Sequence, residues 1–287
     1  MIKIVCSDKQ KLDFIYNILN KSKRNLFFQE FYFYDYLSST QDYAFLLGKK
    51  SETCYPYLVL SEIQTGGRGR RGSNWASPRG GVWMTIVFKT DLEPSELFCM
   101  LILTTLVISD AIKSQLHITP QIKWPNDLLI NGSKVAGILM DTEIEYGKMT
   151  KVTLGIGINS NNDLVVTKSQ IIDKSVAGDL KITTLKYAND GLEINNFELV
   201  SFILYKFSEL VPKLESKLYR DELRNLYRRR IEESLSTLSY KFRIKEYEFK
   251  GEIIKVNDDG SLLVRDLEQL TDNKIVRIDS VFNSSLT

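Results

Sequence analysis

Residues 64–75, Q-T-G-G-R-G-R-R-G-S-N-W, contain four glycines, three arginines and almost nothing apolar. They lie between two apolar runs that are typical of strands, residues 58–60 and 82–88. A segment so rich in glycine has no preferred helix or strand conformation, so it must connect these runs as a loop. Its backbone N–H groups and guanidinium groups suit a carboxylate or a phosphate. The segment predicts either an anion-binding loop or a solvated basic loop.

Composition limits the class of protein. With 287 residues, 43% of them apolar, the chain suits one large domain or one with a small second domain. Its 38 basic and 36 acidic residues give a net charge of +2. This charge is too small for an obvious nucleic-acid or membrane-surface protein, so we expect no DNA and no membrane partner. Any positive site must be local.

The cysteines and the apolar segments indicate a compartment. Cys6, Cys54 and Cys99 are widely spaced and His117 is the only histidine, which excludes a zinc set. We expect these thiols to be free and buried. The N-terminus lacks the pattern of a signal peptide, and residues 97–112 are interrupted by polar residues as in a core helix. These features predict a cytoplasmic protein.

Apolar periodicity predicts an α/β domain followed by a small β-barrel. Asn131-Gly132 between two apolar runs predicts a hairpin, whereas residues 164–191 give no clear pattern. The expected strands are residues 1–5, 31–37, 82–88, 128–130, 135–140 and 151–159, and four short strands follow residue 241. The expected helices are residues 8–20, 41–48 and 95–115, and two more within 197–227.

Two further motifs carry polar chemistry. In K-W-P-N-D, residues 123–127, the proline makes a turn rigid while the asparagine and aspartate can cap backbone groups or bond a ligand. Lys134 begins an otherwise apolar strand near Gly137, and its ammonium group either extends to solvent or lies at a ligand. In S-S-T-Q, residues 38–41, the hydroxyl groups either cap a helix or bond a polar ligand group.

Together these motifs, with G-I-G-I-N at residues 155–159, have the order and spacing found in biotin–protein ligases. The chain resembles that family from about Phe31 to the C-terminus, in its short form without the N-terminal DNA-binding domain. The resemblance implies an α+β fold: a mixed-sheet catalytic domain of the class II synthetase/biotin–lipoate ligase type with a small C-terminal SH3-like β-barrel. It implies an N-terminal extension at residues 1–30, the catalytic domain at 31–237 and the barrel at 238–287.

The resemblance also implies an activity. Such enzymes make biotinyl-5′-AMP from biotin and Mg-ATP, and then transfer biotin to one lysine of a biotin carboxyl carrier protein. ATP and Mg²⁺ are the implied cofactors, with Mg²⁺ near Asp127 and no cage made by protein groups alone. The family allows a homodimer formed through the sheet, for which residues 82–88 offer an edge strand.

Residue roles follow from the same resemblance. Ser73 and Asn74 depart from it, because many relatives carry a basic residue there, and this puts a third phosphate contact in doubt. The implied biotin-binding residues are Ser39, Thr40, Gln41, Gln64, Arg68, Gly69, Arg70, Lys134 and Gly137. The implied adenylate-binding residues are Arg68, Arg70, Trp75, Asn126, Asp127, Lys134 and Asn159. The implied catalytic residues are Lys134, Arg70 and Asp127.

Three other functions compete with this one. A lipoate–protein ligase has a similar fold and chemistry, but its loop is rich in serine and glycine, and K-W-P-N-D favours biotin. A biotin-responsive repressor would need a DNA-reading module, and the thirty or so residues before Phe31 offer one helix only. A biotin-binding module without catalysis would bind the ligand but release no pyrophosphate.

We predict that residues 64–74 are mobile without ligand and become ordered with biotinyl-5′-AMP, because they have no large apolar anchor. Limited proteolysis should cut after Arg68, Arg70 or Arg71 in the empty protein, and the ligand should slow the cleavage. Equal cleavage rates in both states would contradict a loop that orders on the ligand.

Overall fold

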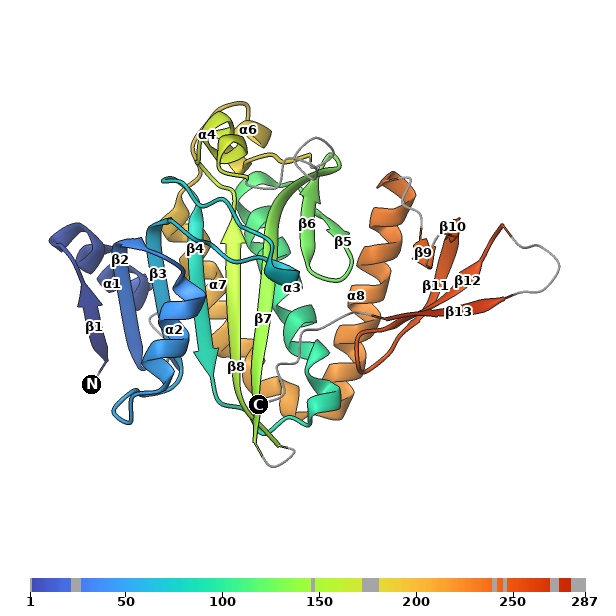
Figure 1. Ribbon diagram of the computed structural model, residues 1–287, viewed down its shortest axis with the longest axis horizontal. Coiled ribbons are helices and arrows are strands. Elements are labelled where there is room, and N and C mark those ends of the chain that lie inside the picture. The colour runs from blue at the N-terminus through green and yellow to red at the C-terminus, as the bar shows by residue number, and fades with distance from the viewer. Residues whose placement is uncertain are drawn as a thin grey trace.

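A computed structural model describes residues 2–21, 27–145, 148–171, 181–238, 242–244, 247–268 and 274–279. In these residues the main sheet has eight strands in the order β1-β2-β3-β4-β8-β7-β6-β5. The first three strands are parallel and the others pair antiparallel, so the sheet is mixed. The predicted α+β class is confirmed (Figure 1).

The elements follow the expected order along the chain. The strands of the main sheet are β1 (Lys3–Cys6), β2 (Glu30–Leu37), β3 (Tyr57–Gln64), β4 (Val82–Phe88), β5 (Gln121–Lys123), β6 (Asp127–Ile130), β7 (Ser133–Glu145) and β8 (Lys148–Ile158). The helices are α1 (Lys9–Lys21), α2 (Thr40–Gly48), α3 (Phe98–Leu116), α4 (Leu164–Ser169), α6 (Leu185–Ala188), α7 (Asn196–Leu210) and α8 (Lys217–Leu238). The last strands are β9 (Phe242–Ile244), β10 (Tyr247–Phe249), β11 (Gly251–Val256), β12 (Leu262–Asp266) and β13 (Ile275–Ile278).

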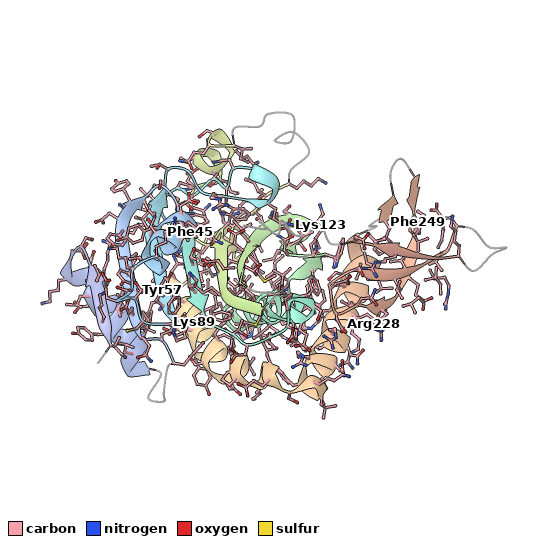
Figure 2. The ribbon with its side chains drawn as sticks, turned by 60° about the horizontal axis from the view of Figure 1, so that its bottom comes forward. Phe45, Tyr57, Lys89, Lys123, Arg228 and Phe249 are labelled. Carbon is pink, nitrogen blue, oxygen red and sulfur yellow. The ribbon has the colours of Figure 1, made fainter. Side chains whose placement is uncertain are left out.

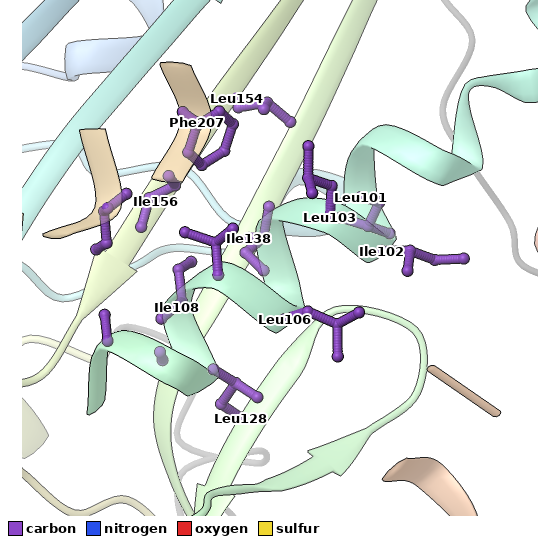
Figure 3. Packing of buried hydrophobic residues seen from close by; sticks show 14 of the residues in the cluster. Leu101, Ile102, Leu103, Leu106, Ile108, Leu128, Ile138, Leu154, Ile156 and Phe207 are labelled. Atoms are coloured by element: carbon purple, nitrogen blue, oxygen red, sulfur yellow. The ribbon is translucent and has the colours of Figure 1, made fainter. Parts of the chain in front are cut away.

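The two faces of the main sheet are covered differently. Helices α3 and α7 lie behind it in the view of Figure 1, α8 lies beside its β5 end, and α2 lies in front. The large buried cluster occupies the α3 side, where Figure 3 shows Ile108 near Ile138 of β7 and Ile156 of β8. A smaller cluster that includes Ala44 and Leu47 fills the space under α2. The sheet therefore has a thick apolar core on one side and room for polar groups on the other.

Helix α3 is the core helix that the sequence predicts. It belongs to the segment Pro94–Leu116, which is long and apolar enough to cross a membrane, but 78% of that window is buried inside the protein. The buried hydroxyls of Thr104 and Thr105 donate to the carbonyl oxygens of Met100 and Leu101 at 2.7 and 2.8 Å. These bonds satisfy the polar groups without solvent, as burial requires.

Two predictions are wrong. Strand β4, residues 82–88, cannot serve as a free edge for a dimer, because it pairs with β3 on one side and β8 on the other. The edges of the main sheet are β1 and β5. The cysteines are free as predicted, but only Cys99 is buried, whereas Cys54 is exposed.

Both ends of the chain are joined to the domain of the main sheet. Strand β1 extends the sheet beside β2, and Ile15 and Ile18 of α1 join the main core. At the other end β11, β12 and β13 form an antiparallel sheet and β9 pairs with β10, which agrees with a small C-terminal β domain. Figure 2 shows this unit, with Phe249, on the same side of the molecule as Lys123. The domain boundaries at residues 30 and 237 stay predictions.

The segment between residues 164 and 191 is partly described. It contains the short helices α4 and α6, whose N-terminal ends are capped by the side chains of Asp163 and Thr184. Its residues 172–180 lie outside the described ones. Sequence periodicity gives no signal here because neither helix is long enough for a repeating apolar face.

The turn between β11 and β12 fastens the C-terminal unit to the main domain. Arg224 of α8 pairs with Asp258 of this turn at 3.1 Å and donates to the Cys99 sulfur at 3.0 Å. Gly260 has a φ of +81°, and a Cβ there would overlap the ring of Phe98. Glycine at this position is therefore required both by the backbone and by the close approach of α3.

We predict that Gly260→Ala destabilises the protein more than Gly191→Ala does. Gly191 also has a positive φ, +85°, but open space surrounds it. Each alanine should cost roughly 1–2 kcal/mol for the left-handed backbone, and Gly260→Ala about 1–3 kcal/mol more for the contact with Phe98. Urea unfolding measures both. Equal losses would contradict the packing of this turn on α3.

Candidate functional site

The predicted site residues line one cavity of about 890 Å³. They reach it from the start of α2, from the loop between β3 and β4, from the turn before β6, and from β7 and β8. The predicted residues among the lining are Ser39, Thr40, Gln41, Gln64, Arg68, Gly69, Arg70, Trp75, Asn126, Asp127, Lys134, Gly137 and Asn159. The structure therefore brings together motifs that are up to 120 residues apart, since Ser39 and Asn159 both line the cavity.

Three glycines on neighbouring strands form the floor of the cavity. Gly137 of β7 is paired with Gly157 of β8, and Gly155 lies two residues before it on the same face. A Cβ on Gly157 would lie 2.5 Å from the Trp75 ring, and one on Gly137 would lie 2.8 Å from it. The indole of Trp75 can therefore lie against the sheet only because these positions lack side chains.

The start of α2 forms a polar end of the cavity. Ser39 caps the helix, since its hydroxyl accepts from the Asp42 N–H at 3.3 Å. Thr40 donates to Gln64 Oε1 through both its backbone N–H, at 2.8 Å, and its hydroxyl, at 3.0 Å. Gln41 Nε2 donates to Asp141 at 3.1 Å, and Gly155 leaves the space that its amide oxygen occupies. Both the capping and the site interpretations of S-S-T-Q are thus compatible with the structure.

The loop rich in glycine and arginine, residues 64–75, is called the Gly/Arg loop here. It has internal hydrogen bonds, and several of its residues line the cavity. Its backbone closes through Trp75 N to Gly67 O at 2.8 Å and Gly69 N to Ser73 O at 2.7 Å. Ser73, one of the neutral departures, donates to Arg70 O at 2.8 Å and so supports the turn. The mobility of the loop in the absence of ligand stays a prediction.

Acidic and amide oxygens hold the loop arginines. Arg68 pairs with Asp42 at 2.7 Å and lies 3.7 Å from Asp141, and both Arg68 and Asp42 are about half exposed. Such an exposed pair contributes little stability, so Arg68 can exchange it for a ligand anion at low cost. Arg70 donates to Asn126 Oδ1 at 2.7 Å, which joins the loop to the turn before β6.

Lys134 lies inside the site. Its ammonium group is 2.8 Å from Asp127 Oδ2 and 4.9 Å from the centre of the Trp75 ring, and its side chain is only 19% exposed. Its backbone is also bonded on both sides, to Lys181 O and from Thr183 N. A lysine that extended into solvent would make neither side-chain contact, so Lys134 does not simply extend into solvent, and its role at a ligand stays a prediction.

The turn that carries Asn126 and Asp127 is held from behind. Tyr227 of α8, fully buried, donates its hydroxyl to Pro125 O at 2.6 Å, and Trp124 Nε1 donates to Gly260 O at 3.2 Å. Burial raises the pKa of Tyr227, and the nearby Asp127 carboxylate raises it further, so the hydroxyl stays a donor. The C-terminal unit and α8 thus position this side of the site.

Several buried polar atoms in the cavity have no hydrogen-bond partner among the described residues. They are Asn74 Oδ1, Trp75 Nε1 and Asp127 Oδ1. Burying such atoms without partners is unfavourable, so their convergence on one cavity indicates a polar ligand. Asn159 differs from them, since its amide oxygen accepts from Asn162 at 3.1 Å.

Sequence reasoning did not identify four residues that shape the site. Asp42 and Asp141 hold Arg68, Thr85 lies behind the polar end, and Tyr227 supports the turn before β6. A period-two pattern along β7 places Asp141 on the same face as Gly137, which is the one signal that was available for it. Asp42, Thr85 and Tyr227 belong to no local sequence motif that could have indicated their place at the site.

Comparison with known proteins identifies relatives of the chain. Residues 33–159 match the Biotin/lipoate A/B protein ligase family. Bifunctional ligase/repressor BirA of Bacillus subtilis is 37% identical over 134 residues, which are 46% of this chain and 41% of that protein. Biotin–[acetyl-CoA-carboxylase] ligase of Paracoccus denitrificans is 36% identical over 103 residues, 35% of this chain and 43% of that protein. The chain therefore spans less than half the length of these two relatives.

A solved structure has the same fold. Biotin protein ligase from Aquifex aeolicus in complex with biotin and ATP aligns with a TM-score of 0.63 and 24% identity. The alignment covers 88% of this chain and 97% of that one. The fold expected from the sequence motifs is thereby confirmed.

We predict that Gly157→Ala displaces the Trp75 indole and that Gly155→Ala does not, because a Cβ on Gly155 meets Gln41 instead. Gly157→Ala should lose about 1–3 kcal/mol of stability and shift tryptophan emission to the red. Gly155→Ala, the control, should keep the parent emission spectrum. Identical spectra for the two variants would contradict a Trp75 ring that rests on Gly157.

Proposed function

We propose that the chain is a biotin protein ligase, which activates biotin with ATP to biotinyl-5′-AMP and transfers biotin to a lysine of a biotin carboxyl carrier protein. The observation that carries the proposal is the two-part cavity. One end has uncharged hydrogen-bonding groups from α2 and Gln64, and the other has Lys134, Arg70 and Asp127. A ligand with a polar ring and a carboxylate at the end of an apolar arm matches both parts.

The polar end favours biotin over lipoate. Thr40, Gln41 and Gln64 present hydroxyl and amide groups, which suit a ring with both N–H and C=O groups. The dithiolane ring of lipoate has neither group, so it could make no such hydrogen bonds with these residues. Apolar lining from Met84, Ile138 and Leu139 suits the arm of the ligand.

The charged part suits adenylate formation. A biotin carboxylate oxygen attacks the α-phosphorus of ATP, a new P–O bond forms, and the bond to pyrophosphate breaks. Negative charge builds on the phosphoryl oxygens, and a fixed cation at this point typically contributes about 2.7–4 kcal/mol to the transition state. Lys134 is held by Asp127 of the K-W-P-N-D motif and by Trp75 of the Gly/Arg loop. Arg70 of that loop is joined to Asn126 of the K-W-P-N-D motif. We assign these two cations to the reacting carboxylate and α-phosphate.

The nucleotide is assigned to the residues around Trp75. Trp75 Nε1 and Asn74 Oδ1 have no hydrogen-bond partner among the described residues and are available to a nucleotide, and Asn126, Asp127 and Asn159 line the same cavity. Arg68 supplies a further cation once it leaves Asp42. The neutral Ser73 and Asn74 then act through the turn and through hydrogen bonding, and not through charge.

The donor groups fit magnesium bound with ATP. The described residues hold no cluster of three acidic, cysteine or histidine side chains, but Asp127 Oδ1 is a carboxylate oxygen without a partner. Mg²⁺ usually takes one or two carboxylates and completes its shell with phosphates and water. Bound there, it would neutralise phosphate charge.

In the second step the amine of the carrier lysine attacks the acyl carbon of the mixed anhydride. An amide bond forms, AMP leaves, and the amine loses a proton. Once pyrophosphate has left with its magnesium, Asp127 is assigned as the acceptor of this proton, since its Oδ1 has no partner among the described residues and its Oδ2 is bonded to Lys134.

Partner and location remain part of the proposal. The carrier is the carrier domain of a biotin-dependent carboxylase, and the protein works in the cytoplasm. A homodimer that continues the main sheet would have to use β1 or β5, its edge strands. A repressor role is the competing function, and a gel shift with genomic fragments tests it, since a ligase alone leaves the DNA unshifted.

We predict that Lys134→Gln keeps the fold but slows biotin-dependent ATP–pyrophosphate exchange by roughly 10²–10³. Biotin affinity should fall less, because the charge is needed mainly in the transition state. Lys113→Gln, an exposed lysine near the end of α3, is the control and should exchange at the parent rate. A folded Lys134→Gln protein with near-parental exchange would remove Lys134 from the mechanism.

A further inference from the structure

A chain of side-chain hydrogen bonds runs behind the polar end of the cavity, buried at Thr85 and partly buried beyond Thr40. Thr85 Oγ1, on β4, is 2.8 Å from Thr40 Oγ1 and 3.2 Å from Gln41 Oε1. Thr40 in turn donates to Gln64 Oε1, Gln64 Nε2 donates to Ser77 Oγ at 2.8 Å, and Ser77 donates to Trp75 O at 3.0 Å. The chain therefore extends from the middle of the main sheet to the Gly/Arg loop.

Which atom donates and which accepts in each bond follows from groups that can act only as donors or only as acceptors. The Thr40 backbone N–H can only donate, so the Gln64 atom facing it must be the carbonyl oxygen. The Thr40 hydroxyl then donates its single hydrogen to the same oxygen and accepts from Thr85. Gln41 is fixed in the same way, because its Nε2 faces two acceptors, Asp141 Oδ2 and Thr153 O, which leaves its oxygen as an acceptor. The single hydrogen of the Thr85 hydroxyl is therefore shared between Thr40 Oγ1, at 2.8 Å, and Gln41 Oε1, at 3.2 Å.

Thr85 is completely buried and does not line the cavity. It lies on β4 opposite Gly155, the glycine whose missing side chain makes room for the Gln41 amide. Among the described residues, its hydroxyl is the one group that bonds both Thr40 and Gln41, and Thr40 and Gln41 are themselves only 3% exposed. Water therefore cannot easily replace Thr85 as their partner.

We infer that Thr85 is a positioning residue that sets ligand specificity at the polar end. With Thr85 donating to it, the Thr40 oxygen has one lone pair left and offers the cavity an acceptor, whereas Gln64 keeps one N–H to offer a donor. One acceptor on Thr40 beside one donor on Gln64 selects a ligand ring that carries both an N–H and a carbonyl group. The inference rests on the proposed function, because biotin is the ligand whose ring it concerns.

Loss of the hydroxyl should weaken biotin binding and leave the nucleotide part unaffected. Without Thr85 as donor, the Thr40 hydroxyl can rotate and the Gln41 oxygen loses a partner. One hydrogen bond of this kind is typically worth about 0.5–1.5 kcal/mol, so the dissociation constant for biotin should rise up to roughly tenfold. The effect should appear in biotin affinity and not in the rate of the chemical step.

Isothermal titration with biotin tests this on the parent, Thr85→Val and Thr85→Ser. Thr85→Val should bind up to roughly tenfold more weakly, while Thr85→Ser, which keeps the hydroxyl, should stay within about twofold. At saturating biotin, the KM for ATP and the maximal exchange rate should match the parent in both variants. If Thr85→Val does not fold, Thr85→Ala and Thr85→Ser form a second pair, since both lack the methyl group and only serine keeps the hydroxyl.

Two outcomes overturn the inference while leaving the proposed function intact. One is parental biotin affinity in Thr85→Val. The other is a loss of biotin and ATP affinity together that Thr85→Ser shares, which would mean a general packing defect. A parent protein that binds no biotin at all would overturn the proposed function and this inference with it.

Discussion

The site depends on the two different faces of β7 and β8. On one face Ile138, Ile156 and Ile158 belong to the main apolar core, which anchors both strands. On the other face Gly137, Gly155 and Gly157 leave a bare backbone surface. Because side chains alternate along a strand, one apolar-and-glycine pattern makes both the core and the floor of the cavity. The side chains of Trp75 and Gln41 lie in the space that a side chain at Gly137, Gly155 or Gly157 would fill.

Charges in the cavity are balanced locally, which explains a site for anions in a chain of net charge +2. Lys134 is paired with Asp127, Arg68 with Asp42, and Arg70 with the amide oxygen of Asn126. Each cation is thus held in place by a partner that an anionic ligand can replace or share. Preorganised cations of this kind avoid reorganisation during the reaction, which is the main way such sites stabilise developing charge.

The sequence predicts local features well. Asn131-Gly132 forms the expected hairpin turn with positive φ at both residues, and Ser39 caps α2 as its residue type indicates. Sheet order is not local, so the interior place of β4 could not be read from its apolar run. The partners of the site residues are also non-local: Tyr227 lies 102 residues from Pro125, and Thr85 lies 45 from Thr40. Motif spacing locates the groups that line the cavity, but the groups that hold them in place can be identified only from the fold.

The central claim is that one cavity both activates biotin and delivers it to a carrier lysine. Its most direct test is incubation of the protein with biotin, ATP, Mg²⁺ and a biotin carboxyl carrier domain, followed by mass spectrometry of the carrier. The account predicts biotin on a single lysine, only when ATP is present, and no transfer of lipoate under the same conditions. An unmodified carrier, or lipoate transferred in place of biotin, would contradict it.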